Sequence, residues 1–332
     1  MSVTIKDVAR AAKVSVATVS RALNGHDNVA EAVRRRVLAV AHELRYSPHH
    51  AARSLSSRRT HTLGVVLPEL HGEFFSELLR GIDQVARERG LHLLVSSYHS
   101  HVSEQAAALR TMRGRVDGLV VMTSFVGEAD HLGENLAALP AVLVNSRPMG
   151  GEATVLAMDN YGGARSMMNH LFASGYRHIA FLDGPANHFD AHERRRGYLD
   201  ALAEHRPGAE PWILEGDFSE ASGHARGMAL LKGGNLPDAV FAANDMSALG
   251  CLLALQHAGI DVPGQVALAG FDDIPMARLV RPGLTTVRAH IDALGEQAAR
   301  LLLAMIEGEE PVERDVRVAT DLVIRDSTRR RS

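Results

Sequence analysis

The chain has 332 residues, more than one hydrophobic core usually supports, so we expect two or three domains. Hydrophobic residues make up 46% of the chain and charged residues 23%, as in ordinary globular proteins. The single cysteine excludes an internal disulfide framework, and the absence of a long apolar run excludes a membrane-spanning helix. Residues 1–12 lack the apolar core of a signal peptide, so we expect a cytoplasmic protein.

Positive charge is concentrated at the N-terminus. Residues 1–60 contain 11 Lys and Arg against 4 Asp and Glu, whereas the remainder contains 25 against 35. A small basic segment on an acidic body indicates a polyanionic partner for that segment.

Three short helical patterns are predicted within residues 1–46. Thr4 and Ser15 are suitable N-cap residues for the first two helices, the second of which should span 16–23. The apolar residues expected on the buried faces are Ile5, Val8, Ala9, Ala12, Val19, Leu23, Val33, Val37, Val40, Ala41 and Leu44. Two short helices joined by a tight turn and braced by a third form a helix-turn-helix, although a plain three-helix bundle fits the pattern too.

The second helix, within "VSVATVSRALNG", would then be the recognition helix. Arg21 can donate two hydrogen bonds to a guanine, and Val16 and Ala17 can make apolar contacts with a thymine methyl. The hydroxyls that can bind phosphate oxygens belong to Ser15, Thr18 and Ser20.

Residues 47–60 form a polar linker with an embedded helical run, in which Ala51, Ala52 and Leu55 share one face. Such a short helix is marginal in water by itself. Arg53, Arg58 and Arg59 would supply positive charge towards phosphates.

The strings "TIKDVARAAKVSVATVSRALNG" and "RYSPHHAARSL" resemble the LacI/GalR family of transcription regulators. The resemblance implies that Val16, Ala17 and Arg21 read bases, and that the linker forms a hinge helix on DNA. In that hinge helix Leu55, with Ala52 beside it, would enter the minor groove and kink the duplex. Phosphate contacts are implied for Thr4, Ser15, Thr18, Ser20, Asn24 and Asn28. Two positions, Val33 and His49, depart from the usual family residues.

From residue 62 onward, strand patterns alternate with helical patterns, which predicts parallel sheets with right-handed crossovers. The predicted strands are "TLGVVLPEL", "LHLLVSSY", "DGLVVMT", "AVLVNS", "HIAFLDG", "AVFAAND" and "VALAGFDD". We therefore expect an α/β fold with two lobes and a ligand cleft at the carboxyl ends of the strands.

The body resembles periplasmic sugar-binding proteins, as the regulatory domain of the family does. That resemblance places the boundaries of a helix-turn-helix domain, a hinge with its linker, and two lobes that each comprise two chain segments. The helix-turn-helix domain would span 1–46, and the hinge with its linker 47–60. The first lobe would comprise 62–159 plus 290–319, and the second lobe 160–289 plus 320–332.

The resemblance also implies a set of ligand-binding residues in the cleft, namely Phe74, Phe75, Arg194, Phe218 and Asp272. Aromatic faces pack against apolar ring surfaces, and a carboxylate or a guanidinium binds several polar groups at once. A second tier of candidates comprises Asn145, Asp159, His188, Asp190 and Asn244. A carbohydrate is the favoured effector because most of the family senses sugars.

No catalytic constellation, cofactor motif or metal site is predicted. His188 and His192 have the spacing of a helical zinc pair, but they lie in a predicted loop and lack the HExxH pattern. Cys251 lies in an apolar helical segment, so it is interpreted as a buried structural thiol.

The sequence therefore predicts a transcriptional repressor, not an enzyme, with no membrane partner. It would bind a double-stranded palindromic operator as a homodimer under the control of a small-molecule effector. A solute-binding protein for a transporter and an enzyme on the same scaffold remain the alternatives, since the fold alone does not decide between them.

Overall fold

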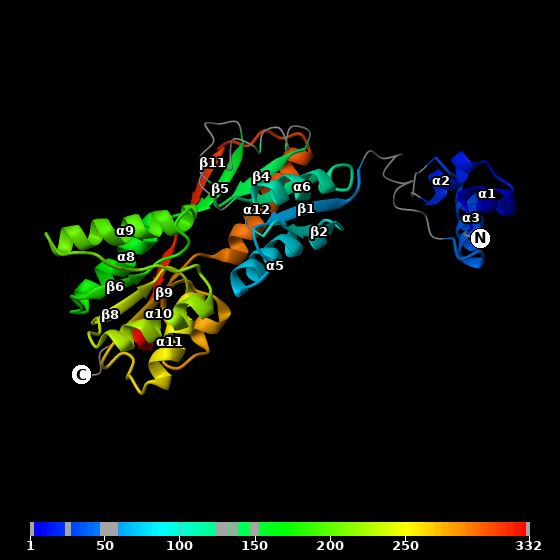
Figure 1. The fold of residues 1–332 in the computed structure, drawn as a ribbon. Helices are drawn as coiled ribbons and strands as arrows, with labels where there is room; N and C mark the ends of the chain where they lie inside the picture. The colour runs from blue at the N-terminus through cyan, green and yellow to red at the C-terminus, as the bar shows by residue number, and fades with distance from the viewer. Residues whose placement is uncertain are drawn as a thin grey trace. The chain divides into compact units, whose positions relative to one another are not determined.

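The computed structural model describes residues 3–23, 28–46, 59–99, 101–123, 132, 136, 139–146 and 153–329. The chain divides into two compact units, Met1–Thr60 and His61–Ser332, which are called the head and the body below (Figure 1). Each unit has its own buried apolar residues, so each is described separately.

The described residues of the head form three helices: α1 (Ile5–Ala12), α2 (Val16–Leu23) and α3 (Glu31–Glu43). The start of α1 is fixed by the Asp7 carboxylate, which accepts hydrogen bonds from the Thr4 backbone N–H at 2.9 Å and from Thr4 Oγ1 at 2.7 Å. Ser15 caps α2, because its Oγ accepts a hydrogen bond from the Thr18 N–H at 3.1 Å. Both predicted N-caps are confirmed.

The core of the head is small and aliphatic. Val8, Val19 and Val37, one from each helix, are fully buried and lie in one cluster. The expectation for α2 was partly wrong, because Ala22 is buried there while Leu23 is only half-buried. A helix this short presents about two residues to a small core, and the two inward positions are Val19 and Ala22.

The first lobe of the body is built on a six-stranded parallel sheet with the order β11-β5-β4-β3-β1-β2. Its strands are β1 (Thr62–Leu67), β2 (His92–Ser97), β3 (Gly118–Met122), β4 (Ala141–Val144), β5 (Thr154–Met158) and β11 (Asp315–Val318). Successive residues of the central strands pack to opposite faces. Val65 and Val120 lie in a cluster with α5 (Glu73–Glu88) and α12 (Ile291–Ile306), whereas Val66 and Val121 lie in a cluster with α6 (Val102–Met112).

The second lobe is built on a six-stranded sheet with the order β12-β10-β9-β8-β6-β7. Its strands are β6 (Ile179–Leu182), β7 (Trp212–Leu214), β8 (Ala239–Ala242), β9 (Ala267–Asp272), β10 (Thr285–Arg288) and β12 (Asp321–Val323). The pairings are parallel except that of β10 with β12, which is antiparallel. The expected class, α/β with parallel-dominated sheets, is confirmed.

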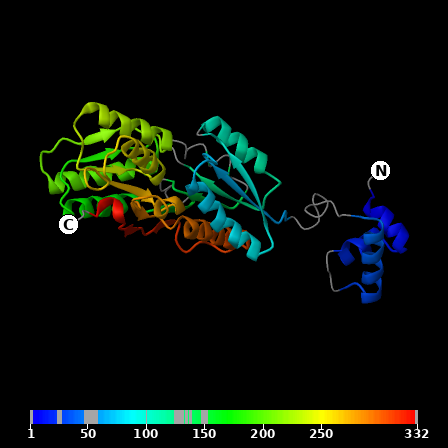
Figure 2. The same ribbon diagram turned by 90° about the horizontal axis from the view of Figure 1, so that it is seen from below.

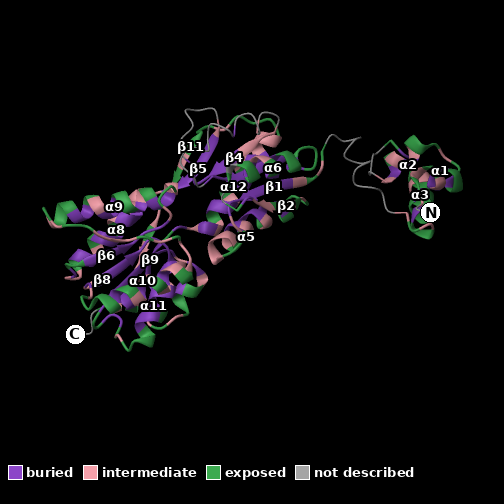
Figure 3. Ribbon diagram, in the orientation of Figure 1, coloured by how far each residue is buried: buried purple, intermediate pink, exposed green. Residues whose placement is uncertain are grey.

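Four helices cover the sheet of the second lobe: α8 (Asn160–Ala173), α9 (Phe189–His205), α10 (Glu220–Gly233) and α11 (Asp245–His257). The pair α8–α9 and the pair α10–α11 lie on opposite faces of the sheet (Figure 1), and the strands between them are buried (Figure 3). At Gly250 the backbones of α10 and α11 approach so closely that a Cβ would lie 1.9 Å from the Glu220 carbonyl oxygen. This contact fixes the start of α10.

The chain passes between the two sheets at three described places. It leaves the first sheet between Met158 and Asn160, returns between Arg288 and Ile291, and leaves again between Val318 and Asp321. The red C-terminal segment and the orange α12 lie beside these passages in the two ribbon views (Figures 1 and 2). The exact lobe boundaries stay predictions.

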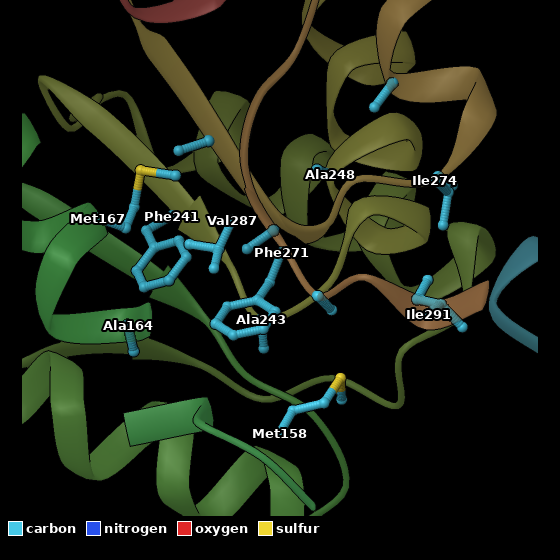
Figure 4. Close-up of a cluster of buried hydrophobic side chains, with 14 of the residues drawn as sticks. Met158, Ala164, Met167, Phe241, Ala243, Ala248, Phe271, Ile274, Val287 and Ile291 are labelled. Atoms are coloured by element: carbon cyan, nitrogen blue, oxygen red, sulfur yellow. The ribbon is translucent and has the colours of Figure 1, made fainter. Parts of the chain in front are cut away.

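Buried apolar side chains are continuous from one lobe to the other. Figure 4 shows Met158, from the end of β5, near Phe271 of β9, and Ile291 of α12 lies in the same buried cluster. Cys251 is fully buried on α11, as predicted. Among the helices that the structure describes, none has the length and apolar character that a membrane crossing requires.

Candidate nucleic-acid interface and ligand pocket

The outer face of α2 carries the residues predicted to meet DNA. Ser15, Val16, Ala17 and Arg21 are exposed, and Thr18 and Ser20 are half-buried. Val16 is 41% exposed, so an aliphatic side chain is available at the surface of α2. An apolar contact and a planar donor on one exposed helix face suit the edges of bases in a major groove.

The remaining predicted DNA contacts are only partly described. Thr4 and Asn28 are both exposed. Thr4 directly precedes α1, and Asn28 lies in the segment before α3. The Thr4 hydroxyl donates to Asp7, so a phosphate contact of this hydroxyl would require its proton to turn away from the Asp7 carboxylate. Asn24, Ala52, Arg53, Leu55 and Arg58 lie outside the described residues, so the predicted hinge helix stays a prediction.

In the body, eight of the ten predicted ligand-binding residues line one cavity of about 360 Å³. Phe74 and Phe75 come from the start of α5 in the first lobe. The six from the second lobe are His188, Asp190, Arg194, Phe218, Asn244 and Asp272. The cavity therefore lies between the lobes, in the size range of small-molecule sites.

Arg194 is the central polar group of this pocket. It lies on α9, is 3% exposed, and its guanidinium carbon is 3.8 Å from the centre of the Phe271 ring. Its Nε donates to Asn160 Oδ1 at 2.8 Å and its Nη1 to the Ala243 carbonyl oxygen at 2.6 Å. Its Nη2 lies 3.1 Å from Asp272 Oδ1. The guanidinium is thus held by groups from three different segments of the second lobe.

Two carboxyl groups flank this arginine. Asp190 is buried one helical turn before Arg194, and its Oδ1 accepts a hydrogen bond from Asn160 Nδ2 at 2.9 Å. Burial away from water raises the pKa of Asp190 to about 7, against the opposing effect of the Arg194 charge. Burial likewise raises the pKa of Asp272 to about 6, and the contact with Arg194 again opposes the shift. Both carboxyls therefore titrate near neutral pH.

His188 caps α9. Its Nδ1 accepts a hydrogen bond from the Asp190 N–H at 3.2 Å, and its ring meets the Phe218 ring edge-on at a centroid distance of 5.0 Å. Burial lowers the pKa of His188 to about 3, so the imidazole is neutral at physiological pH. The prediction of a loop here was wrong: the segment opens a helix, because the imidazole nitrogen does what Ser or Asp does at ordinary N-caps.

Asn244 is the N-cap of α11, and it also holds the pocket wall in place. Its Oδ1 accepts from the Ser247 N–H at 3.0 Å, and its Nδ2 donates to the Phe218 carbonyl oxygen at 3.0 Å. Phe218 has a positive φ of 71°, and its ring lies so close to Gly184 that a Cβ there would be 2.4 Å away. Both residues serve to fix one aromatic face of the cavity.

Two second-tier candidates do not line the cavity. Asn145 is fully buried, with its Oδ1 3.4 Å from the Met158 N–H. Asp159 is the N-cap of α8, where it accepts from the Gly162 N–H at 2.9 Å. Both lie at the passage from the first lobe to the second, so their polar groups stabilise backbone there.

The sequence reasoning missed the residues of the pocket mouth. His71 Nε2 of the first lobe lies 3.6 Å from Glu220 Oε1 of the second. The Met276 N–H of the second lobe donates to Glu73 Oε2 of the first at 2.9 Å. Other lining residues that were missed are Glu69, Met122, Asp217, Ser219 and Met246. Their only sequence signal is their position directly after strands or beside the predicted residues.

Comparison with known proteins agrees with this geometry. Residues 4–49 match the model for bacterial regulatory proteins of the lacI family, and residues 168–328 match the model for a periplasmic binding protein-like domain. The transcriptional regulator GalR of Salmonella typhimurium is 38% identical over 305 residues, covering 91% of this chain and 89% of the relative.

The chain belongs to the lacI family of bacterial regulatory proteins.

Solved structures of lacI-family proteins resemble it along their whole length. The lac repressor dimer bound to operator and the anti-inducer ONPF has a TM-score of 0.89 at 28% identity, with 99% of each chain covered. The CelR–cellobiose complex has a TM-score of 0.72 at 31% identity, with 98% of this chain and 99% of that chain covered. The predicted family, with its helix-turn-helix head and periplasmic-binding-protein-like body, is confirmed.

Proposed function

We propose that this lacI-family protein represses transcription by binding a palindromic DNA operator as a homodimer, and that a carbohydrate effector in the interlobe pocket controls its affinity. The observation that carries the proposal is the cavity between the lobes, which brings together residues from both of them around one buried arginine. The solved relatives support each half, since one holds operator DNA and another holds cellobiose.

The head supplies the operator contacts. Arg21 would donate to a guanine, and Val16 and Ala17 would contact neighbouring bases, while Thr4, Ser15, Thr18, Ser20, Asn24 and Asn28 would bind phosphates. A single short recognition helix reads only a few base pairs, so two heads on two half-sites are needed for a useful specificity ratio. Ala52, Arg53 and Leu55 of the hinge would add minor-groove and phosphate contacts. A protein with this role would act in the cytoplasm, where the operator is.

The pocket supplies the control. Phe74 and Phe75 of the first lobe and Phe218 of the second would pack against the ring faces of a sugar, while Asp190, Arg194 and Asp272 would bind its hydroxyls. A ligand that touches both lobes stabilises the lobe arrangement to which it binds best, and this changes the relation between the two hinges of a dimer. Such coupling is typically about 1–3 kcal/mol per site.

The curated relatives are regulators, and we propose a binding role for this pocket with no chemical turnover. His188 and His192 do not form a metal site with a third ligand among the described residues, and the Cys251 thiol is buried with its pKa raised to about 12. The Cys251 thiol is therefore a packing group and not a nucleophile.

The proposal is tested in two steps. A thermal-shift screen of the full-length protein against sugars should reveal a ligand that raises Tm, as expected for any compound that binds the folded state. The operator is selected from random duplex DNA, and its affinity is then measured with and without that ligand. A change of about fivefold or more in operator affinity supports the proposal. A sugar that binds without altering operator affinity contradicts the control role.

A further inference from the structure

The charged residues around the pocket indicate which class of sugar it binds, an inference that rests on the proposed function. Arg194 is the only lysine or arginine that lines the cavity in the described part of the chain, whereas five carboxyl groups do so. They are Glu69, Asp190, Asp217, Glu220 and Asp272. A site of this composition has many hydrogen-bond acceptors and few cations to offer to a ligand.

The one cation is already engaged. Nε, Nη1 and Nη2 of Arg194 each face a protein oxygen, from Asn160, Ala243 and Asp272 at 2.8, 2.6 and 3.1 Å. The Asp272 carboxylate offsets its charge, and the Phe271 ring covers its planar face. The remaining guanidinium N–H groups can still donate to a ligand, but an anion would meet a cation whose charge Asp272 already offsets.

The histidines of the pocket do not supply additional positive charge. His188 is neutral at physiological pH, because its Nδ1 accepts the Asp190 N–H and burial disfavours its protonation. His71 lies at the mouth with its Nε2 3.6 Å from Glu220, so any positive charge on it is offset by that carboxylate. A phosphate entering the cavity would therefore pass rim carboxylates and find no uncommitted cation inside.

We propose that the pocket selects an uncharged, hydroxyl-rich carbohydrate and rejects its phosphorylated or carboxylated counterpart. Sugar hydroxyls donate to the carboxyl oxygens of Asp190 and Asp272, and the phenyl rings of Phe74, Phe75 and Phe218 cover the apolar ring faces. The rejection comes from like charge at the rim and from the offset of the Arg194 charge by Asp272, so selectivity rests on repulsion as well as on attraction.

The test measures affinities in matched pairs by calorimetry on the full-length protein. Glucose is compared with glucose 6-phosphate and with glucuronate, galactose with galactose 6-phosphate and with galacturonate, and cellobiose with cellobionate. We expect every sugar that binds to do so at least about tenfold more tightly than its anionic counterpart, which corresponds to about 1.4 kcal/mol. An anionic member that binds as tightly as its neutral partner overturns the inference.

A charge variant separates rim repulsion from shape. Asp217→Asn with Glu220→Gln removes two carboxylates from the rim. Asp83→Asn with Glu104→Gln makes the same change of charge at a half-buried position of α5 and an exposed position of α6, neither of which lines the cavity. The affinity ratio of neutral to anionic ligand should fall about threefold to tenfold in the rim variant and stay constant in the control. The rim variant also loses the His71–Glu220 contact, but that loss affects the binding of both ligands of a pair. The ratio of the two affinities is therefore the quantity that reports on charge.

The outcomes distinguish this inference from the proposed function. If an anionic sugar binds best and shifts operator affinity, the control role stands and the charge selectivity is wrong. If no carbohydrate of either charge binds, the carbohydrate assignment itself is wrong, and the selectivity falls with it. If the rim and control variants change the ratio equally, the rim carboxylates are not its source.

Discussion

Arg194 and Asp272 form a buried ion pair, with Nη2 3.1 Å from Oδ1 and both side chains at most 5% exposed. The next residue, Asp273, pairs with Arg288 at 2.7 Å and with Arg325 at 2.5 Å. Arg288 ends β10 just before the chain returns to the first lobe, and Arg325 follows β12. Two adjacent aspartates thus connect the ligand pocket to a passage between the lobes, a route by which a ligand could bias lobe geometry.

Removing the arginine of this pair should destabilise the protein. In Arg194→Met, Asp272 and Asn160 keep their burial but lose their partner, and breaking a buried pair typically costs about 3–5 kcal/mol. Arg196→Met is the matched control, since Arg196 is 45% exposed and pairs with Glu193 on its own helix, where such pairs contribute about 0–1 kcal/mol. Urea unfolding of both variants gives the free energies. Equal losses would show that Arg194 has no special structural role.

The Asp190 carboxyl should make stability depend on pH. Its pKa is raised from 3.8 to about 7 in the folded protein, so the folded state holds a proton that the unfolded state releases above about pH 4. The associated stability is present at low pH and is lost as pH rises towards 7, with a limiting slope of about 1.4 kcal/mol per pH unit.

Asp190→Asn removes this titration and keeps an oxygen that can accept from Asn160 Nδ2. The unfolding free energy of the variant minus that of the wild type should therefore increase from pH 5 to pH 7 and level off above pH 7. The lowered pKa of His188 makes both proteins lose stability as pH falls below about 6.5. Because this loss is common to the wild type and the variant, it cancels when one unfolding free energy is subtracted from the other. A difference that stays constant over this range refutes the assignment.

The contact between Glu73 and the Met276 N–H should slow ligand release, because it joins the two lobes at 2.9 Å next to Phe74, which lines the cavity. Glu73→Ala removes the acceptor, and a half-exposed hydrogen bond contributes about 1 kcal/mol. Stopped-flow measurement with a sugar found in the screen should show dissociation about fivefold faster. Glu73→Gln retains an acceptor oxygen and should largely restore the slow rate. Wild-type kinetics in the Ala variant would mean that the contact does not hold the lobes together.

Two arginines of the head should differ in what they contribute to DNA binding. Arg21→Ala should reduce discrimination at one guanine of each half-site, at about 1–3 kcal/mol, because the residue lies exposed on α2. Arg59→Ala should weaken binding to all sequences and flatten the dependence on salt. Competition binding with single-base operator variants at several salt concentrations measures both effects. A uniform loss from both variants contradicts the assignment of Arg21.

Much of the fold follows from the sequence, because many of its strands are distinct apolar runs. The strands β1, β2, β3, β4, β6, β8 and β9 all lie within predicted segments. The strands β5, β7, β10, β11 and β12 were not predicted. Of these, β10, β11 and β12 contain polar or charged residues, so their sequences are not apolar runs, and they form by pairing with other strands of the sheets.

In the pocket too, contacts between distant segments could not be predicted from the sequence. The resemblance to the family identifies individual residues such as Arg194, and eight of the ten predicted residues line the cavity. The mouth contact of His71 with Glu220 joins two lobes and has no local signature. Backbone geometry was also beyond reach, since Asp272 and Asp273 both have positive φ, at 114° and 58°, which only tertiary contacts impose on such residues.

The most direct test of the account is the binding of the full-length protein to DNA selected from random duplexes, at modest salt and with excess competitor. The account predicts enrichment of a palindrome, bound by two chains, whose affinity changes about fivefold or more when a sugar found in the screen is added. An Asp272→Asn variant should bind the same palindrome without that response. If no palindrome is preferred over competitor DNA, with or without sugar, the central claim is wrong.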